Sequence, residues 1–148
     1  VISFFDASIE KMVALAILMP IVASMGGNAG TQTLTLTVRS LATKELVDTN
    51  RKKVFIKEIA ISILNGLIFA VITSLATILW FNDFSLAIIV GAAMVINIFS
   101  AGLFGFLIPY SLNYFRVDPA LASSVFVTTV TDVFGFLSFL GLASFFLF

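Results

Sequence analysis

The sequence contains no cysteine and no histidine, and only 11% of its 148 residues are charged. These absences exclude disulfides, thiolate chemistry and imidazole ligands for a metal ion. Any metal site must therefore use oxygen ligands, which suit hard cations such as Mg²⁺ or Ca²⁺. A water-soluble domain of this length would carry about a quarter charged residues. The shortage of charge therefore excludes an ordinary soluble fold.

Hydrophobic residues make up 60% of the chain, and the mean hydropathy is +1.16. Four segments are long enough to cross a bilayer as helices, at about residues 11–41, 54–81, 84–112 and 119–148. We therefore predict an all-α integral membrane protein, a polytopic helical bundle that forms one transmembrane domain over residues 1–148. The chain begins with Val rather than Met, so we expect it to be a piece of a longer protein.

Basic residues are concentrated around the connection between the first two segments. Six of the eight lie there: Arg39, Lys44, Arg51, Lys52, Lys53 and Lys57. Because cytoplasmic loops are rich in Lys and Arg, we predict that the loop at residues 42–53 is cytoplasmic. The next connection contains Asp83 and no basic residue, and the third contains Arg116. The predicted orientation therefore places the C-terminus outside the cell (inner or plasma) membrane.

Asp132 is the only charged residue between Pro119 and Phe148. A helical rise of about 1.5 Å per residue places it roughly 20 Å from the start of its segment, near the middle of the hydrocarbon. A carboxylate at that depth costs on the order of 2.5–3.5 kcal/mol and is seldom kept without a polar or aqueous partner. We therefore predict that Asp132 faces a water-filled path and handles a cation or a proton. A buried ion pair with Arg39 is the structural alternative.

Small and hydroxyl-bearing residues share the helical face of Asp132 by their spacing. They are Ser124, Thr128, Thr131 and Gly135. A groove that is narrow at the glycine and lined by hydroxyls could solvate a hydrated ion. Alternatively, the hydroxyls bond to their own helix and Gly135 permits close packing.

The first segment carries a second polar line. Pro20 removes a backbone donor, so we expect the carbonyls one turn earlier to lose their partners, and Gly26, Gly27 and Gly30 let the backbone relax and approach closely. Freed carbonyls and the Asn28 side chain would be oxygen donors to a hydrated cation. Thr31 or Gln32, Thr35 and Arg39 follow at helical spacing. Gly26-x-x-x-Gly30 is equally a helix-packing motif. The predicted metal-binding residues are Asp132, Asn28, Thr128, Ser124, Gly26 and Gly27. We predict Asn65 and Asn97 instead as hydrogen-bond partners between helices.

One carboxylate supplies a single negative charge to a divalent ion, which leaves the ion under-compensated in a low-dielectric setting. Two copies around a twofold axis would present two Asp132 carboxylates to one ion, and twofold dimers are the commonest oligomers. We therefore predict a homodimer in the lipid bilayer, with its pore at the twofold axis.

Four stretches stand out in the sequence. They are PIVASMGGNAGTQ from Pro20, RSLAT, VFIKE, and VDPALASS followed by TTVTD, which ends at Asp132. Together they closely resemble the MgtE family of magnesium channels and transporters. The resemblance implies a homodimer with five spans per subunit, so that the four complete spans here follow a largely missing first one. It implies a pore formed by the first and last spans of this chain, with the family's ion-binding Asp at Asp132 and its Asn at Asn28. Family members often carry Asn where this chain has Ser124. Many also have cytoplasmic regulatory domains, and we expect none within residues 1–148.

The function we predict is Mg²⁺ transport through a dimeric pore, without enzymatic activity and without a nucleic-acid partner. Mn²⁺, Co²⁺ and Ca²⁺ stay open as further ions, because oxygen sites grade ions by size and rigidity. A carrier coupled to Na⁺ or H⁺ is the first alternative. An intramembrane aspartyl enzyme is another, although it would need two carboxylates sharing a proton. A non-transporting membrane scaffold is the last.

Overall fold

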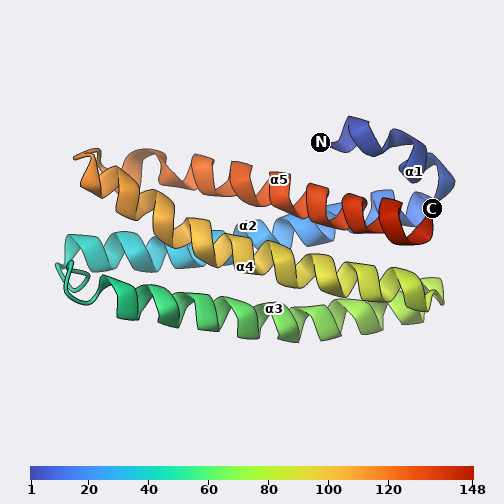
Figure 1. Ribbon diagram of the computed structural model, residues 1–148, viewed down its shortest axis with the longest axis horizontal. Coiled ribbons are helices and arrows are strands. Elements are labelled where there is room, and N and C mark those ends of the chain that lie inside the picture. The colour runs from blue at the N-terminus through green and yellow to red at the C-terminus, as the bar shows by residue number, and fades with distance from the viewer.

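The protein is all-helical in the computed structural model, which describes residues 1–148 except for the side chain of Ala122. Its elements in chain order are η1 (Ile2–Phe5), α1 (Asp6–Lys11), α2 (Val13–Ala42), α3 (Arg51–Phe81), α4 (Phe84–Tyr114) and α5 (Pro119–Leu147). The four long helices run along the length of the molecule, and successive helices are antiparallel (Figure 1). All four are long and apolar enough to cross a membrane. The prediction of four long apolar helices in a bundle is therefore confirmed.

Polar residues at the turns explain where two of the helices begin. Asp83 precedes α4, and its carboxylate accepts a hydrogen bond of 3.0 Å from the backbone N–H of Leu86. Asp118 does the same for α5 by accepting from the N–H of Ala120 at 3.0 Å. Such side chains satisfy helix N–H groups that have no carbonyl partner within the helix. The connections before α4 and α5 are short, so α4 lies side by side with both α3 and α5.

α2 remains helical across Pro20 and the glycine run, from Val13 to Ala42. This differs from the relaxed backbone that the sequence predicted. Pro20 has no N–H, so it cannot donate to the carbonyl four residues before it. The glycines keep helical geometry, and their missing side chains instead let neighbouring helices approach. The glycines therefore do not interrupt the helix, whereas the carbonyl one turn before Pro20 lacks its usual N–H donor, as predicted.

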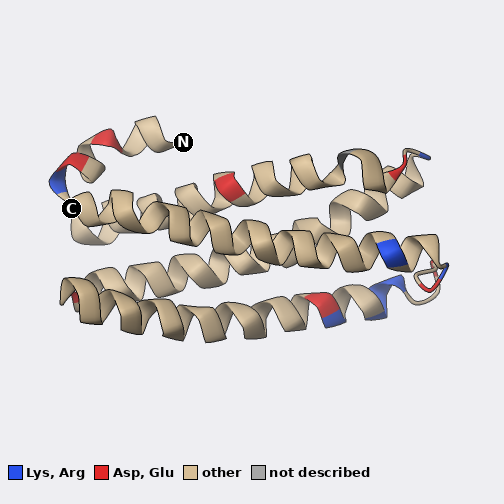
Figure 2. Ribbon diagram, turned by 180° about the vertical axis from the view of Figure 1, so that it is seen from behind, with Lys and Arg blue, Asp and Glu red and all other residues tan. Residues whose placement is uncertain are grey.

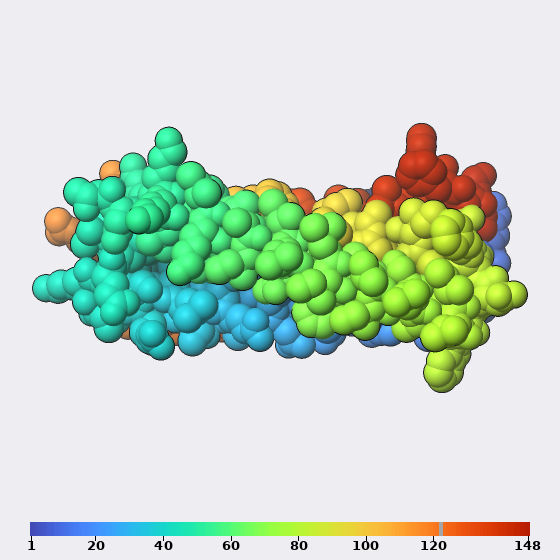
Figure 3. Space-filling view, turned by 90° about the horizontal axis from the view of Figure 1, so that it is seen from below, coloured from blue at the N-terminus to red at the C-terminus, as the bar shows by residue number. Residues whose placement is uncertain are grey.

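α4 is the central helix, because it packs along α2, α3 and α5. Its most apolar stretch is 67% buried, whereas that of α3 is only 11% buried. α3 packs mainly on α4 and lies across one face of the molecule beside α2 (Figure 3). The apolar core is formed by α2, α4 and α5, with Leu15, Met94 and Phe139 fully buried. α2 and α5 are thus held on the same central helix.

Charged residues gather at the two ends of the bundle, and α5 carries a single acidic band along its length (Figure 2). At the end with the α2–α3 loop, the Tyr110 hydroxyl accepts a hydrogen bond of 3.0 Å from Arg51. The same hydroxyl donates a hydrogen bond of 2.9 Å to the carboxylate of Asp48. Tyr110 thereby ties the loop to α4 and fixes this end of the bundle.

Candidate ion-binding site

Asp132 is exposed in the middle of α5. It lines a hollow of about 450 Å³ together with Thr129, Val133 and Phe136 of the same helix and the first three residues of the chain. Arg39 does not line this hollow, and no Lys or Arg of the described chain lies within the 4.0 Å of an ion pair from the Asp132 carboxylate. The ion pair considered as the structural alternative is therefore not formed.

The polar residues predicted to share one face of α5 divide between two faces. Ser124 is exposed and Thr128 half-buried, on the same side as Asp132. Thr131 is fully buried, and Gly135 faces the interior. The division follows from helix geometry, since residues four apart stay aligned while Thr131 lies about 100° round from Asp132.

The hydroxyls on the open face of α5 hydrogen-bond to their own helix. The Thr128 hydroxyl donates to the carbonyl of Ser124 at 2.9 Å, and that of Thr129 donates to the carbonyl of Val125 at 2.7 Å. A hydroxyl that donates in this way keeps its oxygen lone pairs as acceptors. The open face therefore presents a carboxylate and hydroxyl oxygens, which can accept hydrogen bonds from the water around a cation.

α2 shows the same separation of faces. Asn28, Thr31, Gln32 and Thr35 are exposed, and the Thr31 hydroxyl donates to the carbonyl of Gly27 at 2.9 Å. The two predictions for this segment, ion binding and helix packing, therefore concern two different sides of the same helix. One side offers an amide and hydroxyls, and the other is the packing side.

The packing side of α2 is made by its glycines. Gly26 is buried, and a methyl group there would overlap the side-chain amide of Asn97. A methyl group at Gly30 would lie 2.7 Å from Val127 of α5. Gly27 is half-buried, and a methyl group at this residue would lie 3.9 Å from the Thr131 hydroxyl. Gly26 and Gly27 as ion ligands stay predictions, and the structure places Gly26 at a helix interface.

Sequence reasoning missed one residue of the open face and identified one buried partner correctly. Thr129 lines the hollow of Asp132, and its spacing of three residues from the acid is a signal that could have found it. Asn97 donates a hydrogen bond of 2.7 Å from Nδ2 to the carbonyl of Val22. Its predicted role as a hydrogen-bond partner between helices is therefore confirmed.

The described residues contain no group of three or more His, Cys, Asp or Glu side chains that could hold a metal ion. Within one chain, Asp132 is therefore a lone carboxylate among hydroxyl and amide oxygens. Mg²⁺ is commonly held through one or two carboxylates while it keeps several of its waters. The chemistry of this face suits a hydrated ion better than a fully dehydrated one.

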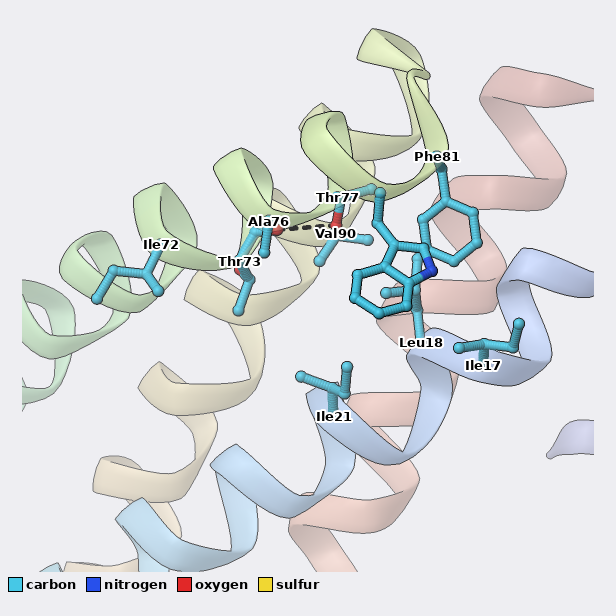
Figure 4. A pocket seen from close by; sticks show the side chains of 10 residues that line it. Ile17, Leu18, Ile21, Ile72, Thr73, Ala76, Thr77, Phe81 and Val90 are labelled. Carbon is cyan, nitrogen blue, oxygen red and sulfur yellow. Dashed lines mark hydrogen bonds between the residues drawn. The ribbon is translucent and has the colours of Figure 1, made fainter.

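A second hollow, of about 320 Å³, lies between α2 and α3. Figure 4 shows its apolar lining, with Ile17, Leu18 and Ile21 on α2 facing Ile72 and Ala76 on α3. Its two threonines donate to carbonyls of their own helix, as in the 2.8 Å bond from Thr77 to Thr73. This hollow contains no charged group and offers no site for an ion.

The chain is similar to one family model and to curated proteins of the same name. The family model described as a divalent cation transporter, MgtE, matches residues 19–142. The chain is 31% identical over 147 residues to the magnesium transporter MgtE of Bacillus subtilis (strain 168), covering 99% of this chain and 33% of that protein. It is 36% identical over 139 residues to the magnesium transporter MgtE of Thermus thermophilus, covering 94% of this chain and 31% of that protein.

A third relative is the magnesium transporter MgtE of Enterococcus faecalis, which is 31% identical over 146 residues, covering 99% of this chain and 32% of that protein. The chain spans about a third of the length of these curated relatives. All three are named as transporters, in agreement with the expected non-enzymatic function. Because the matched region takes in most of the sequence, with all of α3 and α4 and most of α2 and α5, this chain belongs to the MgtE family of divalent cation transporters.

Proposed function

We propose that this chain carries Mg²⁺ across a membrane along a water-filled path lined by α2 and α5. The observation that carries the proposal is Asp132, a carboxylate exposed in the middle of a helix that is otherwise suited to lipid. Exposure to hydrocarbon would cost it on the order of 2.5–3.5 kcal/mol. An aqueous path removes that cost, and the names of the relatives favour Mg²⁺ as the ion.

The exposed polar faces of α2 and α5 support a homodimer. A single chain in a bilayer would turn Asn28, Thr31 and Thr35 of α2 toward lipid, together with Ser124 and Asp132 of α5. A second copy related by a twofold axis covers both faces and encloses water between them. It also brings two Asp132 carboxylates to the path, and their charge balances that of one divalent ion.

The ion passes this point with water bound to it. Mg²⁺ loses its water reluctantly, so Asp132 meets the ion's water ligands rather than replacing the whole shell. The hydroxyl oxygens of Ser124 and Thr128 and the amide oxygen of Asn28 accept hydrogen bonds from the same waters. Contacts through water are weak enough to let the ion leave, which conduction requires.

The distribution of charge supports one orientation of the chain in the membrane. The basic α2–α3 loop contains Lys44, followed by Arg51, Lys52 and Lys53 at the start of α3. By the positive-inside rule this end faces the cytoplasm. The hollow of Asp132 then lies along the path between the two sides of the cell membrane.

The test is Mg²⁺ uptake into proteoliposomes, followed with a Mg²⁺-sensitive dye inside the vesicles. Asp132→Asn keeps the shape of the side chain and removes its charge, and we expect it to abolish most of the uptake. Glu45→Gln is the matched control, because it removes an exposed carboxylate from the α2–α3 loop. Uptake at the wild-type rate in Asp132→Asn would contradict the proposal.

The same vesicles separate a channel from a coupled carrier. We expect uptake to follow the Mg²⁺ gradient and the membrane potential when the Na⁺ and pH gradients are abolished. Uptake that stops without one of those gradients would support the carrier. Replacing Mg²⁺ by Mn²⁺, Co²⁺ or Ca²⁺ gives the order of selectivity.

A further inference from the structure

We infer that Asn97 of α4 is a positioning residue for ion transport, which holds α2 and α5 at a fixed spacing behind the ion path. The inference rests on the proposed function. It assigns a role to a side chain that touches neither the hollow of Asp132 nor the exposed face of α2. It begins from an amide that is fully buried at the centre of the bundle.

The hydrogen bond of Asn97 joins α4 to α2 at a carbonyl that the helix already uses. Nδ2 donates to the carbonyl of Val22 at 2.7 Å. Within α2, that carbonyl accepts from the N–H four residues later, which belongs to Gly26. The bond from Asn97 is therefore not needed to satisfy α2. It adds a directional link between the two helices at this level of the bundle.

Two glycines, one on each side, make the space for this amide. A methyl group at Gly26 of α2 would overlap the Asn97 amide, and one at Gly135 of α5 would lie 2.7 Å from Nδ2. In both cases the added methyl group would lie closer to the Asn97 amide than ordinary van der Waals contact allows. The Asn97 amide thus fills a niche between α2 and α5, beside a direct contact of the two helices, since a methyl group at Gly135 would also lie 3.4 Å from the Cα atom of Ala23 in α2.

Packing alone does not account for asparagine at this position. The Oδ1 atom of Asn97 is buried and accepts no hydrogen bond from the described protein. A leucine has a similar size and would fill an apolar niche without leaving an acceptor unpaired. Retaining the amide fixes the spacing by a hydrogen bond, whose direction and length tolerate less variation than apolar contact does.

The two glycines lie close to the proposed ion-binding residues along their helices. Gly26 is two residues before Asn28, which places Asn28 about 200° round α2, on the side away from Asn97. Gly135 is three residues after Asp132, which places the carboxylate about 60° round α5 and one turn away. A change of spacing at Asn97 therefore shifts the Asn28 amide and the Asp132 carboxylate relative to each other.

The experiment measures spacing and transport in the same variants. Because the chain has no cysteine, spin labels can be attached at Thr31→Cys and Thr129→Cys, both at exposed positions. Their distance is measured by electron resonance in vesicles. Because Thr31 and Thr129 lie on the proposed ion path, transport is measured in the same variants without labels and with both threonines retained. It is recorded as the Mg²⁺ concentration that gives half-maximal uptake and as the ratio of Mg²⁺ to Ca²⁺ uptake.

The variants remove the hydrogen bond or overfill the niche. Asn97→Leu keeps the volume and loses the donor, and Gly26→Ala adds a methyl group against the amide. We expect both to shift or broaden the spin-label distance and to raise the half-maximal Mg²⁺ concentration about tenfold, since small misplacements of binding groups have effects of this order.

Gly102→Ala is the matched control. A methyl group there would overlap Ser62 of α3, so the variant disturbs α4 as strongly but on the side away from α2 and α5. We expect it to lower the melting temperature and to leave both the distance and the half-maximal concentration unchanged. A purely structural role for Asn97 predicts instead that Asn97→Leu behaves like Gly102→Ala.

An unchanged distance and an unchanged half-maximal concentration in folded Asn97→Leu would overturn the inference. If Asn97→Leu does not fold, Asn97→Ala decides the question with the same two readouts, because it only opens space. If the wild-type vesicles take up no Mg²⁺, the proposed function fails. The spin-label distances then still show whether Asn97 sets the spacing of α2 and α5.

Discussion

The number of Asp132 carboxylates that meet one ion can be counted by removing them one at a time. The perturbation is Asp132→Asn in one copy or in both copies of the proposed dimer. Two unit charges about 4 Å apart are worth about 1 kcal/mol in water. Asp132 is exposed to a hollow of about 450 Å³, and the proposed path holds water, so the dielectric constant of water gives the lower bound of this energy.

A divalent ion doubles that energy, so each carboxylate contributes about 2 kcal/mol to its occupancy. The loss of one Asp132 is then expected to raise the half-maximal Mg²⁺ concentration about 30-fold, and the loss of both about a thousandfold. The equal steps follow because both carboxylates act on the same ion across water. A shorter distance or a lower dielectric constant would enlarge both steps together.

The assay uses copies that carry two different affinity tags. Coexpression and two successive purification steps isolate dimers with one Asp132→Asn copy, and uptake is then measured in proteoliposomes. Dimers of two wild-type copies and dimers of two variant copies complete the series. Retagged wild-type copies show whether the tags themselves affect uptake.

A path within each chain makes a different prediction from a shared path. With separate paths, one Asp132→Asn copy halves the maximal rate and leaves the half-maximal concentration of the other copy unchanged. That result would refute the reasoning that one ion meets a pair of carboxylates. It would leave Asp132 as an ion-binding residue of a single chain.

Two further predictions concern the ends of the bundle. Tyr110→Phe removes the hydroxyl that bonds to Arg51 and Asp48. Because this cluster is exposed, we expect only a small fall in the melting temperature and unchanged Mg²⁺ uptake. A loss of uptake would show that the loop takes part in transport. Asp83→Ala removes the acceptor for the N–H of Leu86. We expect this change to lower the stability by about 1 kcal/mol, measured by denaturant unfolding in detergent. An unchanged stability would show that water caps α4 equally well.

The helices were predictable because their signal is compositional. Long apolar runs interrupted by short polar connections predict helices in a membrane. The four long helices of the structure coincide with these apolar runs. The start of α3 was placed three residues late, since the structure begins it at Arg51. Arg51, Lys52 and Lys53 are hydrophilic, so a prediction from hydropathy leaves them outside the membrane span. Lys and Arg are nevertheless good helix formers, so the helix includes them.

The polar lines were predicted in part. Spacing correctly aligned Ser124, Thr128 and Asp132, which are four residues apart. It also grouped Thr131 and Gly135 with them, and both face the interior. Residues three and four apart drift to either side of a line along the helix, so spacing alone defines a broad face and not its boundary.

The amino-acid sequence by itself determined that the chain forms membrane helices and that one of them carries an acid at mid-length. Hydrophobicity and helical rise are local properties, and no contact between helices is needed to compute them. Only the tertiary structure decided which side of α2 and α5 is open. The rotation of each helix depends on what packs against it, and here the Asn97 amide packs against Gly26 of α2 and Gly135 of α5. The spacing of two residues in the sequence gives the angle between them around the helix axis. The packing of neighbouring helices determines which of the two residues faces the interior.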